Sequence, residues 1–138
     1  MARVLGRAYD SALSGSGLNI TQLAVMRTVL RHPNEPLSRV ADDLAMDRTS
    51  LYRALALLRK NKWIVLEPGS DERSRRGSVT AEGRKTLARA DQDWAAAQTV
   101  IVERFGEAKW PSFVAELRRL AECVAKNPLD PPASGASA

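Results

Sequence analysis

Apolar residues recur every three or four positions in six stretches of the chain, which is the spacing of an amphipathic helix. The six helices predicted in this way cover residues 1–13, 21–31, 37–44, 47–61, 81–105 and 109–126. Thr21 is the predicted N-cap of the second helix, and Pro33 and Pro36 end it. A Ser-Gly-Ser-Gly run at 14–17 and Gly106 separate two other pairs of helices. The sequence therefore predicts a mainly helical fold.

Two short runs of strand-forming residues interrupt the helices. Residues 63–66 are Trp-Ile-Val-Leu, residues 77–80 are Gly-Ser-Val-Thr, and the charged loop 68–76 lies between them. Such runs joined by a short loop are typical of a β-hairpin. We expect a small hairpin whose tip carries Arg73, Arg75 and Arg76.

The helix predicted at 47–61 has two chemically different faces. We expect Asp47 to cap it by accepting the backbone N–H of Thr49 or Ser50. On a helical wheel the apolar face consists of Leu51, Ala54, Leu55 and Leu58. The opposite face carries Thr49, Tyr52, Arg53, Ala56 and Lys60. One side of this helix is therefore predicted core, and the other is polar and basic.

Helix, short helix, turn, capped helix and hairpin is the order of a winged helix-turn-helix, whose second helix enters the major groove of DNA. Thr49 can contact a thymine methyl group, and Arg53 can bind O6 and N7 of guanine. Contacts to phosphates position a protein without reading sequence, and they are expected from Ser38, Arg39, Arg48, Ser50 and Lys60. We expect Tyr52 to contact DNA, the alternative being that it packs against its own domain.

The hairpin arginines are the candidate contacts to the minor groove, where narrow A·T-rich tracts concentrate negative potential. Asp71, two residues before Arg73, is expected to orient that arginine through an ion pair. Such an exposed ion pair contributes only about 0 to 1 kcal/mol to stability, so we expect it to orient the Arg73 side chain and not to stabilise the fold.

The distribution of charge agrees with this interpretation. The chain has a net charge of +5, but residues 48–89 hold eleven basic and four acidic side chains, a net charge of +7. A positive potential focused on one segment favours a polyanionic partner, most often nucleic acid.

Composition excludes several other classes of protein. The chain has 138 residues, 44% of them hydrophobic, which is enough to bury a core. One cysteine, Cys123, and one histidine, His32, cannot form an internal disulfide or a zinc site. We predict no metal site, no cofactor and no enzymatic activity, because phosphate-binding glycine loops and nucleophile motifs are also missing. Without a long apolar run, we expect a cytoplasmic protein that does not enter membranes.

The terminal helices carry more apolar surface than one small domain can cover. Leu87, Ala90, Trp94, Ala97 and Ile101 follow a 3-4-3-4 spacing that favours packing against a facing helix. We expect residues 1–20 and 84–127 to form dimerisation helices and residues 21–83 to form the DNA-binding lobe. Residues 128–138 are predicted to be a disordered tail. The alternative is a monomer in which the terminal helices cover their own lobe.

Residues 18–83 resemble the MarR family of bacterial transcriptional regulators. The resemblance rests on four ordered segments, namely Leu-Asn-Ile-Thr-Gln at 18–22, Leu-Ser-Arg-Val-Ala at 37–41, Asp-Arg-Thr-Ser-Leu-Tyr-Arg-Ala-Leu at 47–55 and Thr-Ala-Glu-Gly at 80–83. Asp71-Glu72-Arg73 fits the Asp-x-Arg motif of the family's wing. The family usually has glycine at the position of Lys62 and leucine at that of Val79. We expect Asn61 to take the left-handed cap conformation instead.

The resemblance implies a homodimer held by its first and last helices, with the long helix joining the dimer body to the DNA-binding lobe. It further implies a repressor of transcription that reads an inverted repeat and is relieved by a small molecule. Tyr9 and Trp94 are candidates for lining an effector pocket, as the family suggests for aromatic acids, with core packing as the alternative. The first predicted helix is shorter than is common in the family.

Other residues have structural interpretations. We expect Cys123 to be a structural residue on the last helix, His32 to have a capping or surface role, Trp63 to lie under the hairpin and Trp110 to pack at a helix start. The alternative function is a winged-helix module that binds proteins without specific DNA binding. Thr49, Arg53 and the hairpin arginines favour the DNA-binding interpretation over this one.

Overall fold

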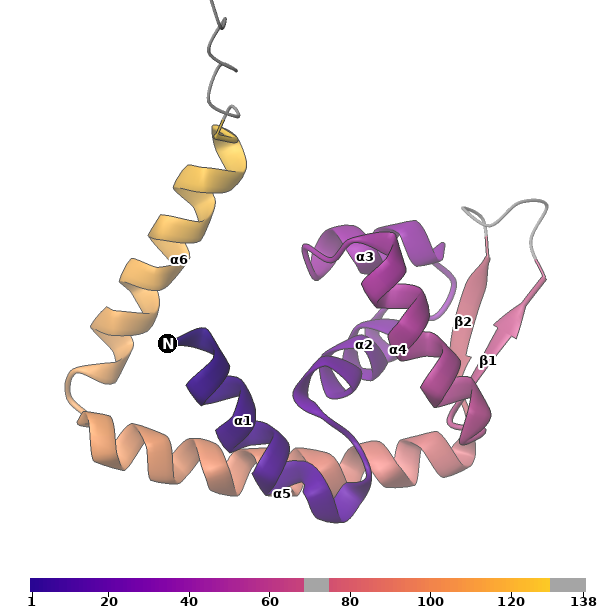
Figure 1. Ribbon diagram of the computed structural model, residues 1–138, viewed down its shortest axis with the longest axis horizontal. Coiled ribbons are helices and arrows are strands. Elements are labelled where there is room, and N and C mark those ends of the chain that lie inside the picture. Colours follow the sequence, from indigo (N-terminus) through magenta and orange to yellow (C-terminus); the bar gives the residue numbers. More distant parts are fainter. Residues whose placement is uncertain (69–74, 130–138) are drawn as a thin grey trace, which may run out of the picture. The chain divides into compact units, whose positions relative to one another are not determined.

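The computed structural model describes residues 1–68 and 75–129. Over these ranges the chain forms six α-helices, one short 3-10 helix and two β-strands (Figure 1). They follow in the order α1 Ala2–Leu13, the 3-10 helix Ser14–Ser16, α2 Ile20–Arg31, α3 Leu37–Asp43, α4 Arg48–Lys60, β1 Ile64–Glu67, β2 Arg76–Val79, α5 Ala81–Phe105 and α6 Trp110–Lys126. The mainly α fold with a small β-hairpin is therefore confirmed. From residue 130 onward the predicted tail lies outside the described residues.

The chain divides into two compact units, residues 1–98 and residues 99–138. The first unit contains the hydrophobic core, which is built where α1, α2, α3, α4, β1 and the first half of α5 meet. Its largest fully buried apolar side chains are Leu13, Leu23, Met26, Leu37, Leu51, Leu55 and Leu58. Trp63, predicted to be a core residue under the hairpin, packs against this core but is only half-buried.

A capping box starts α2 one residue earlier than the predicted helix. The side chain of Asn19 accepts the backbone N–H of Gln22 at 2.8 Å, and the side chain of Gln22 accepts that of Asn19 at 3.0 Å. The carboxylate of Asp10 accepts the N–H of Ile20 at 2.8 Å. The prediction that Thr21 is the N-cap is therefore wrong, because the reciprocal Asn-x-x-Gln pair satisfies the first amides of the helix.

The hairpin is an antiparallel pair in which Ile64 faces Val79 and Glu67 faces Arg76. Arg76 is the first residue of β2, so its predicted place at the tip of the hairpin is wrong. Along the other edge of β2 the N–H of Leu37 donates to the carbonyl of Arg75 at 2.8 Å, and Pro36 forms a bridge with Arg76. The hairpin is thereby fastened to the start of α3.

Thr80 ends the hairpin and starts α5. Its hydroxyl donates to the carbonyl of Lys62 at 2.7 Å and accepts the N–H of Gly83 at 3.0 Å. A β-carbon on Gly83 would overlap the carbonyl oxygen of Trp63, so only glycine allows this close approach. The Thr-x-x-Gly motif therefore joins the hairpin to the long helix.

The second unit holds an aromatic cluster around the turn between α5 and α6. Phe105, Trp110 and Phe113 lie with ring centroids 4.8 to 5.8 Å apart, which confirms a packing role for Trp110 at the helix start. Gly106 makes the turn with φ of 117°. No residue of α6 is buried in the single chain, and its apolar side chains Phe113, Leu117, Leu120 and Val124 are exposed.

Candidate nucleic-acid interface

The start of α4 is fixed by Asp47. One carboxylate oxygen accepts the backbone N–H of Ser50 at 2.8 Å, and the other accepts the Ser50 hydroxyl at 2.9 Å. These hydrogen bonds lower the pKa of the Asp47 carboxyl below its ordinary value, and the one from the backbone N–H has the largest effect. The positive charge of Arg53 acts in the same direction. The predicted cap is confirmed, with Ser50 as the partner. The hydroxyl hydrogen of Ser50 is engaged in this cap.

The two predicted faces of α4 are present. Leu51, Ala54, Leu55 and Leu58 are buried. Arg48, Thr49, Arg53 and Lys60 are exposed. Tyr52 is half-buried and packs against the core, so part of its surface is already covered by its own domain. The exposed side chains that the sequence singled out therefore share a helix whose other side is anchored in the core.

A groove runs between the N-terminus of α2 and the exposed side of α4. It is lined by Asn19, Thr21, Gln22, Ser50, Arg53, Ala54 and Leu57. The start of α2 thus lies beside the proposed base-reading arginine, which the sequence analysis did not predict. The Asn-x-x-Gln spacing at 19–22 could have placed the start of α2, because a capping box marks the first residue of a helix. That this start lies beside α4 depends on packing between distant parts of the chain.

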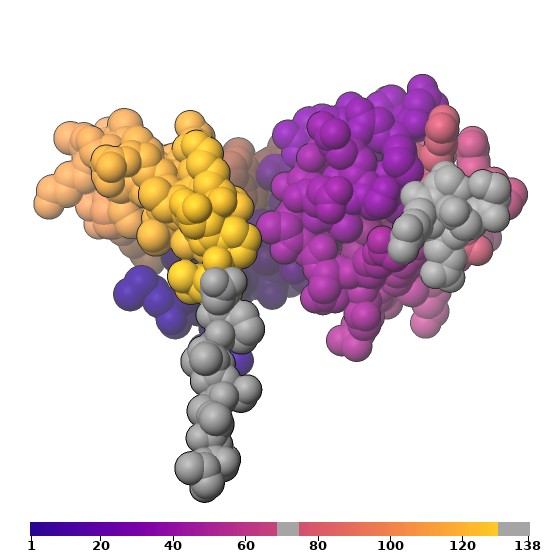
Figure 2. Space-filling model, turned by 90° about the horizontal axis from the view of Figure 1, so that it is seen from above, coloured from indigo at the N-terminus to yellow at the C-terminus, as the bar shows by residue number. Residues whose placement is uncertain are grey.

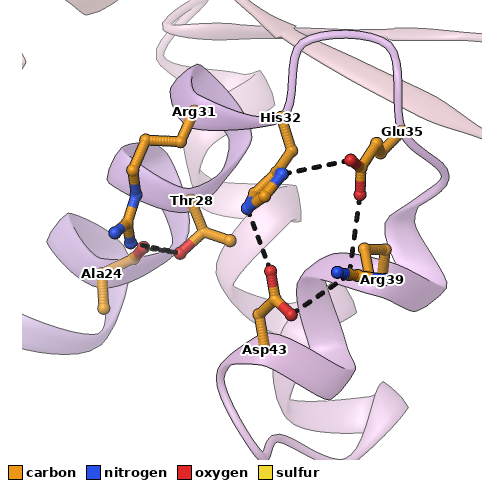
Figure 3. A network of polar contacts seen from close by, with 7 residues as sticks. All are labelled: Ala24, Thr28, Arg31, His32, Glu35, Arg39 and Asp43. Atoms are coloured by element: carbon orange, nitrogen blue, oxygen red, sulfur yellow. Dashed lines mark hydrogen bonds and ion pairs between the residues drawn. The ribbon is translucent and has the colours of Figure 1, made fainter.

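Helix α3 brings Ser38 and Arg39 to the same unit. Arg39 is exposed, and its Nε lies 3.2 Å from Oδ1 of Asp43 and 3.6 Å from Oε2 of Glu35 (Figure 3). His32 forms the C-cap of α2 and also contacts both carboxylates, which agrees with the predicted capping role. In Figure 2 the purple and magenta segments that include α3 and α4 form one continuous surface beside the pink strands.

The hairpin residues are only partly placed. Arg75, which directly precedes β2, is half-buried, and Arg76, the first residue of β2, is exposed. Asp71 and Arg73 lie outside the described residues. Their predicted contacts with DNA stay predictions.

Tyr9 and Trp94, the candidate effector residues, are brought together by α1 and α5. Their rings stack with centroids 6.3 Å apart, and the Tyr9 hydroxyl donates to the side chain of Gln98. Burial raises the pKa of Tyr9. The guanidinium of Arg27 lies 4.6 Å from the centroid of the Trp94 ring, a cation–π geometry.

Trp94 also lines an open groove between α2 and α5. The other lining residues are Arg27, Leu30, Arg31, Leu87 and Asp91, and Tyr9 is not among them. Arg27 is paired with Asp91, whose Oδ1 lies 2.6 Å from Nη2 and 2.7 Å from Nε. This groove therefore combines an aromatic face with two arginines, one of them held by a carboxylate.

Comparison with known proteins places this geometry in a family. No family model matches the chain, and no curated protein matches it. The solved structure of the M. tuberculosis transcriptional regulator MosR in complex with DNA is 30% identical to this chain, with a TM-score of 0.79. The alignment covers 93% of this chain and 92% of MosR.

Two other solved structures share the fold. The Staphylococcus aureus MarR in complex with salicylate and kanamycin is 16% identical, has a TM-score of 0.76, and covers 91% of this chain and 86% of its own. The Streptomyces coelicolor regulator PcaV in complex with its natural ligand is 18% identical, has a TM-score of 0.75, and covers 88% of this chain and 89% of its own. The chain belongs to the MarR family of transcriptional regulators.

This MarR protein departs from the family pattern at the end of α4. Lys62 itself adopts the left-handed conformation, with φ of 59°, while Asn61 has φ of −83°. The prediction that Asn61 takes the left-handed conformation is therefore wrong. The backbone needs a positive φ at the position where the family has glycine, and the lysine accepts it.

Cys123 of this MarR-family protein lies on α6 as a free thiol that is exposed in the single chain, so one chain alone does not support the structural role expected for it. The apolar residues of α6 and those of the first turns of α1, Val4 and Leu5, are exposed in the same way. Within residues 1–68 and 75–129, no helix combines the length and the apolarity that crossing a lipid bilayer requires.

Proposed function

We propose that this protein is a dimeric, sequence-specific DNA-binding regulator that represses transcription until a small molecule releases it. The observation that carries the proposal is the geometry of α4. Its exposed side presents Thr49 and Arg53, while its other side is buried in the core. The MosR relative, 30% identical, was solved in complex with DNA.

In this proposal α4 lies in the major groove. Arg53 binds O6 and N7 of a guanine, and Thr49 contacts a thymine methyl group or donates a hydrogen bond. Arg48, Lys60, Ser38 and Arg39 bind phosphates and so fix the register without reading bases. The asymmetry of α4, with a core face and a donor-rich face, supports this division of roles.

The hairpin, residues 68–77, is proposed to reach the minor groove with Arg73, Arg75 and Arg76, Asp71 orienting Arg73. The register of β1 and β2 and the hydrogen bond from Leu37 to Arg75 support this role, because they hold the loop end of the hairpin beside α3. Arginines suit a narrow minor groove, where the negative potential is strongest.

The two exposed apolar surfaces are proposed to bind a second copy of the chain. One consists of Val4 and Leu5 on α1, and the other of Phe113, Leu117, Leu120 and Val124 on α6. Apolar faces of this kind are typical of interfaces that bury them. A two-fold dimer would present two α4 helices about one helical turn, roughly 34 Å, apart and would read an inverted repeat.

The groove between α2 and α5 is the proposed effector site. Trp94 lines the groove with its aromatic side chain, and Arg27 and Arg31 offer positive charge, which suits an aromatic acid. A bound carboxylate would compete with Asp91 for Arg27 and so alter the link between α2 and α5. S. aureus MarR was solved with salicylate, and PcaV with its natural ligand, which supports a small-molecule effector in this protein.

Footprinting of the purified full-length protein on genomic DNA tests the proposal. We expect a small set of protected sites, each an inverted repeat with half-sites about one helical turn apart. Salicylate, used as a probe aromatic acid, is expected to weaken this protection in the wild type. Arg27→Gln should remove the response to salicylate, and Arg104→Gln, in the last turn of α5, should retain it. Uniform protection of all fragments, with no palindromic site, would contradict the proposal.

A further inference from the structure

Four charged side chains form a closed ring where α2 meets α3 (Figure 3). We call His32, Glu35, Arg39 and Asp43 the α2–α3 cluster. Nδ1 of His32 lies 3.3 Å from Oε1 of Glu35, and Nε2 lies 3.0 Å from Oδ2 of Asp43. The remaining oxygens of the two carboxylates both face Nε of Arg39. Each carboxylate therefore joins the histidine to the arginine.

Only the charged form of the imidazole can make both histidine contacts as hydrogen bonds. A carboxylate accepts hydrogen bonds and donates none, and each ring nitrogen of His32 faces a carboxylate oxygen. A neutral imidazole has one N–H, so one of its nitrogens would turn a lone pair toward an anion. When His32 loses its proton, one of its two contacts with the carboxylates is lost, and the closed arrangement of four side chains is broken at that contact.

The net charge of the cluster changes with the same proton. Two positive and two negative groups give zero when His32 is charged, and the cluster carries −1 when His32 is neutral. Arg31 of α2 lies beside the cluster and points toward Thr28, whose hydroxyl oxygen lies 3.5 Å from Nη2. The backbones of Arg75 and Arg76 pair with Leu37 and Pro36, the residues that follow Glu35. Within the cluster, His32 and Arg39 supply the positive charges that face Glu35 and Asp43.

Arg39 connects this cluster to the proposed DNA-binding surface. Its contacts with both carboxylates involve Nε, and its side chain is 57% exposed. A guanidinium has five N–H donors, so those of the terminal nitrogens remain to bind a phosphate. A phosphate approaching Arg39 meets a neutral cluster when His32 is charged and an anionic one when it is neutral.

We propose that the α2–α3 cluster is a proton-sensitive clamp that strengthens DNA binding under mildly acidic conditions. The protonated His32 ties the end of α2 and the loop at Glu35 to the last turn of α3, and it removes the charge that would repel a phosphate at Arg39. Histidine is the side chain whose ordinary charge change falls between pH 5 and 8. The effect on DNA rests on the proposed function, whereas the effect on the fold does not.

Thermal melting at pH 6 and pH 8 tests the clamp without DNA. The charged form makes both contacts, so the stability they contribute is present at the lower pH and is lost as pH rises. We expect the melting temperature of the wild type to exceed that of His32→Gln by about 2 to 5 °C at pH 6 and by less at pH 8. Glu35→Gln keeps the histidine but removes one contact and should show a smaller difference between the two pH values. A difference from His32→Gln that is the same at both pH values would overturn the clamp.

Fluorescence anisotropy with a footprinted DNA site tests the link to binding at constant ionic strength. Wild-type affinity should fall about two- to fivefold between pH 6 and pH 8, while that of His32→Gln should change little. Glu82→Gln removes the exposed partner of Lys85 and should keep the full wild-type response. Equal pH responses in the wild type and His32→Gln would refute the link. If neither the wild type nor His32→Gln binds DNA specifically at either pH, the proposed function fails. The clamp is then tested by the melting experiment alone.

Discussion

Gly83, in the first turn of α5, lies directly against the backbone carbonyl of Trp63, and a β-carbon at Gly83 would overlap that oxygen. Gly83→Ala must move the hairpin or α5, and overpacking of this kind costs about 1 to 3 kcal/mol. We expect a lower midpoint in urea unfolding. Gly6→Ala in α1 is the matched control, since its β-carbon would meet nothing within 4 Å and alanine favours a helix by about 0.5 to 1 kcal/mol. Equal stability of Gly83→Ala and the wild type would contradict the close approach.

Lys62 adopts a left-handed backbone conformation that costs a non-glycine residue about 1 to 2 kcal/mol. Lys62→Gly should therefore raise the free energy of unfolding by up to about 1 kcal/mol, allowing for the greater freedom of glycine in the unfolded chain. Denaturant melts of the two proteins measure this change. Asn61→Gly, at a position with negative φ, should lower stability, and the same gain in both variants would argue against a local backbone effect.

Arg53 and Arg48 occupy exposed positions of α4 and are proposed to act differently on DNA. Arg53→Ala should cost about 1 to 3 kcal/mol on the specific site and relax the base preference at one position. Arg48→Ala should weaken specific and random DNA alike and reduce the slope of log affinity against log salt by about 1. Competition binding with single-base variants of the site separates the two. Identical losses on both kinds of DNA for both variants would reject the division of roles.

Leu117 and Leu120 are exposed on α6 in the single chain. Leu117→Glu with Leu120→Glu should convert the proposed dimer into a monomer, because charges would enter an interface that buries this face. Sedimentation velocity measures the state, and the double variant should also lose affinity for an inverted repeat. Arg119→Gln, at an exposed polar position of the same helix, should remain dimeric. A monomeric wild type would contradict the prediction.

The cap at Asp47 predicts a pH dependence of stability. Hydrogen bonds from Ser50 lower the pKa of Asp47 in the folded chain, so its stabilisation is present above the ordinary value of 3.8 and is lost as pH falls through the lower folded value. The melting temperature of Asp47→Ala should be lower than that of the wild type at pH 7, and the two should converge in acid. Asp42→Ala, at an exposed position of α3, provides the comparison. A gap that persists unchanged into acid would exclude the cap as its cause.

Helices with regular apolar spacing could be predicted from the sequence to within a residue or two. The bounds of α4 and α5 follow from Asp47, from the run of leucines behind it and from Gly106. Their signals are local, because a cap and an apolar face act within a few residues. The same holds for the exposed side of α4, which follows once its buried side is known.

Features that depend on distant parts of the chain could not be predicted in this way. The register that places Arg76 in β2 depends on the pairing with Glu67 and on the bridge to Pro36. The cluster around His32 needs residues from α2, its loop and α3 together. By contrast, Asn19 was within reach of sequence reasoning, since its partner Gln22 is only three residues away.

The hairpin is fastened at two points, by Thr80 at its base and by the pairing of Pro36 and Leu37 with Arg76 and Arg75 along its edge. An insertion or deletion between Lys62 and Glu67 would change the pairing of β1 with β2 and would disturb both attachments. Segments of different length grafted between Glu67 and Arg75 would leave both attachments in place. The protein therefore offers one position at which the proposed minor-groove segment can be replaced while α4, the proposed major-groove helix, stays unchanged.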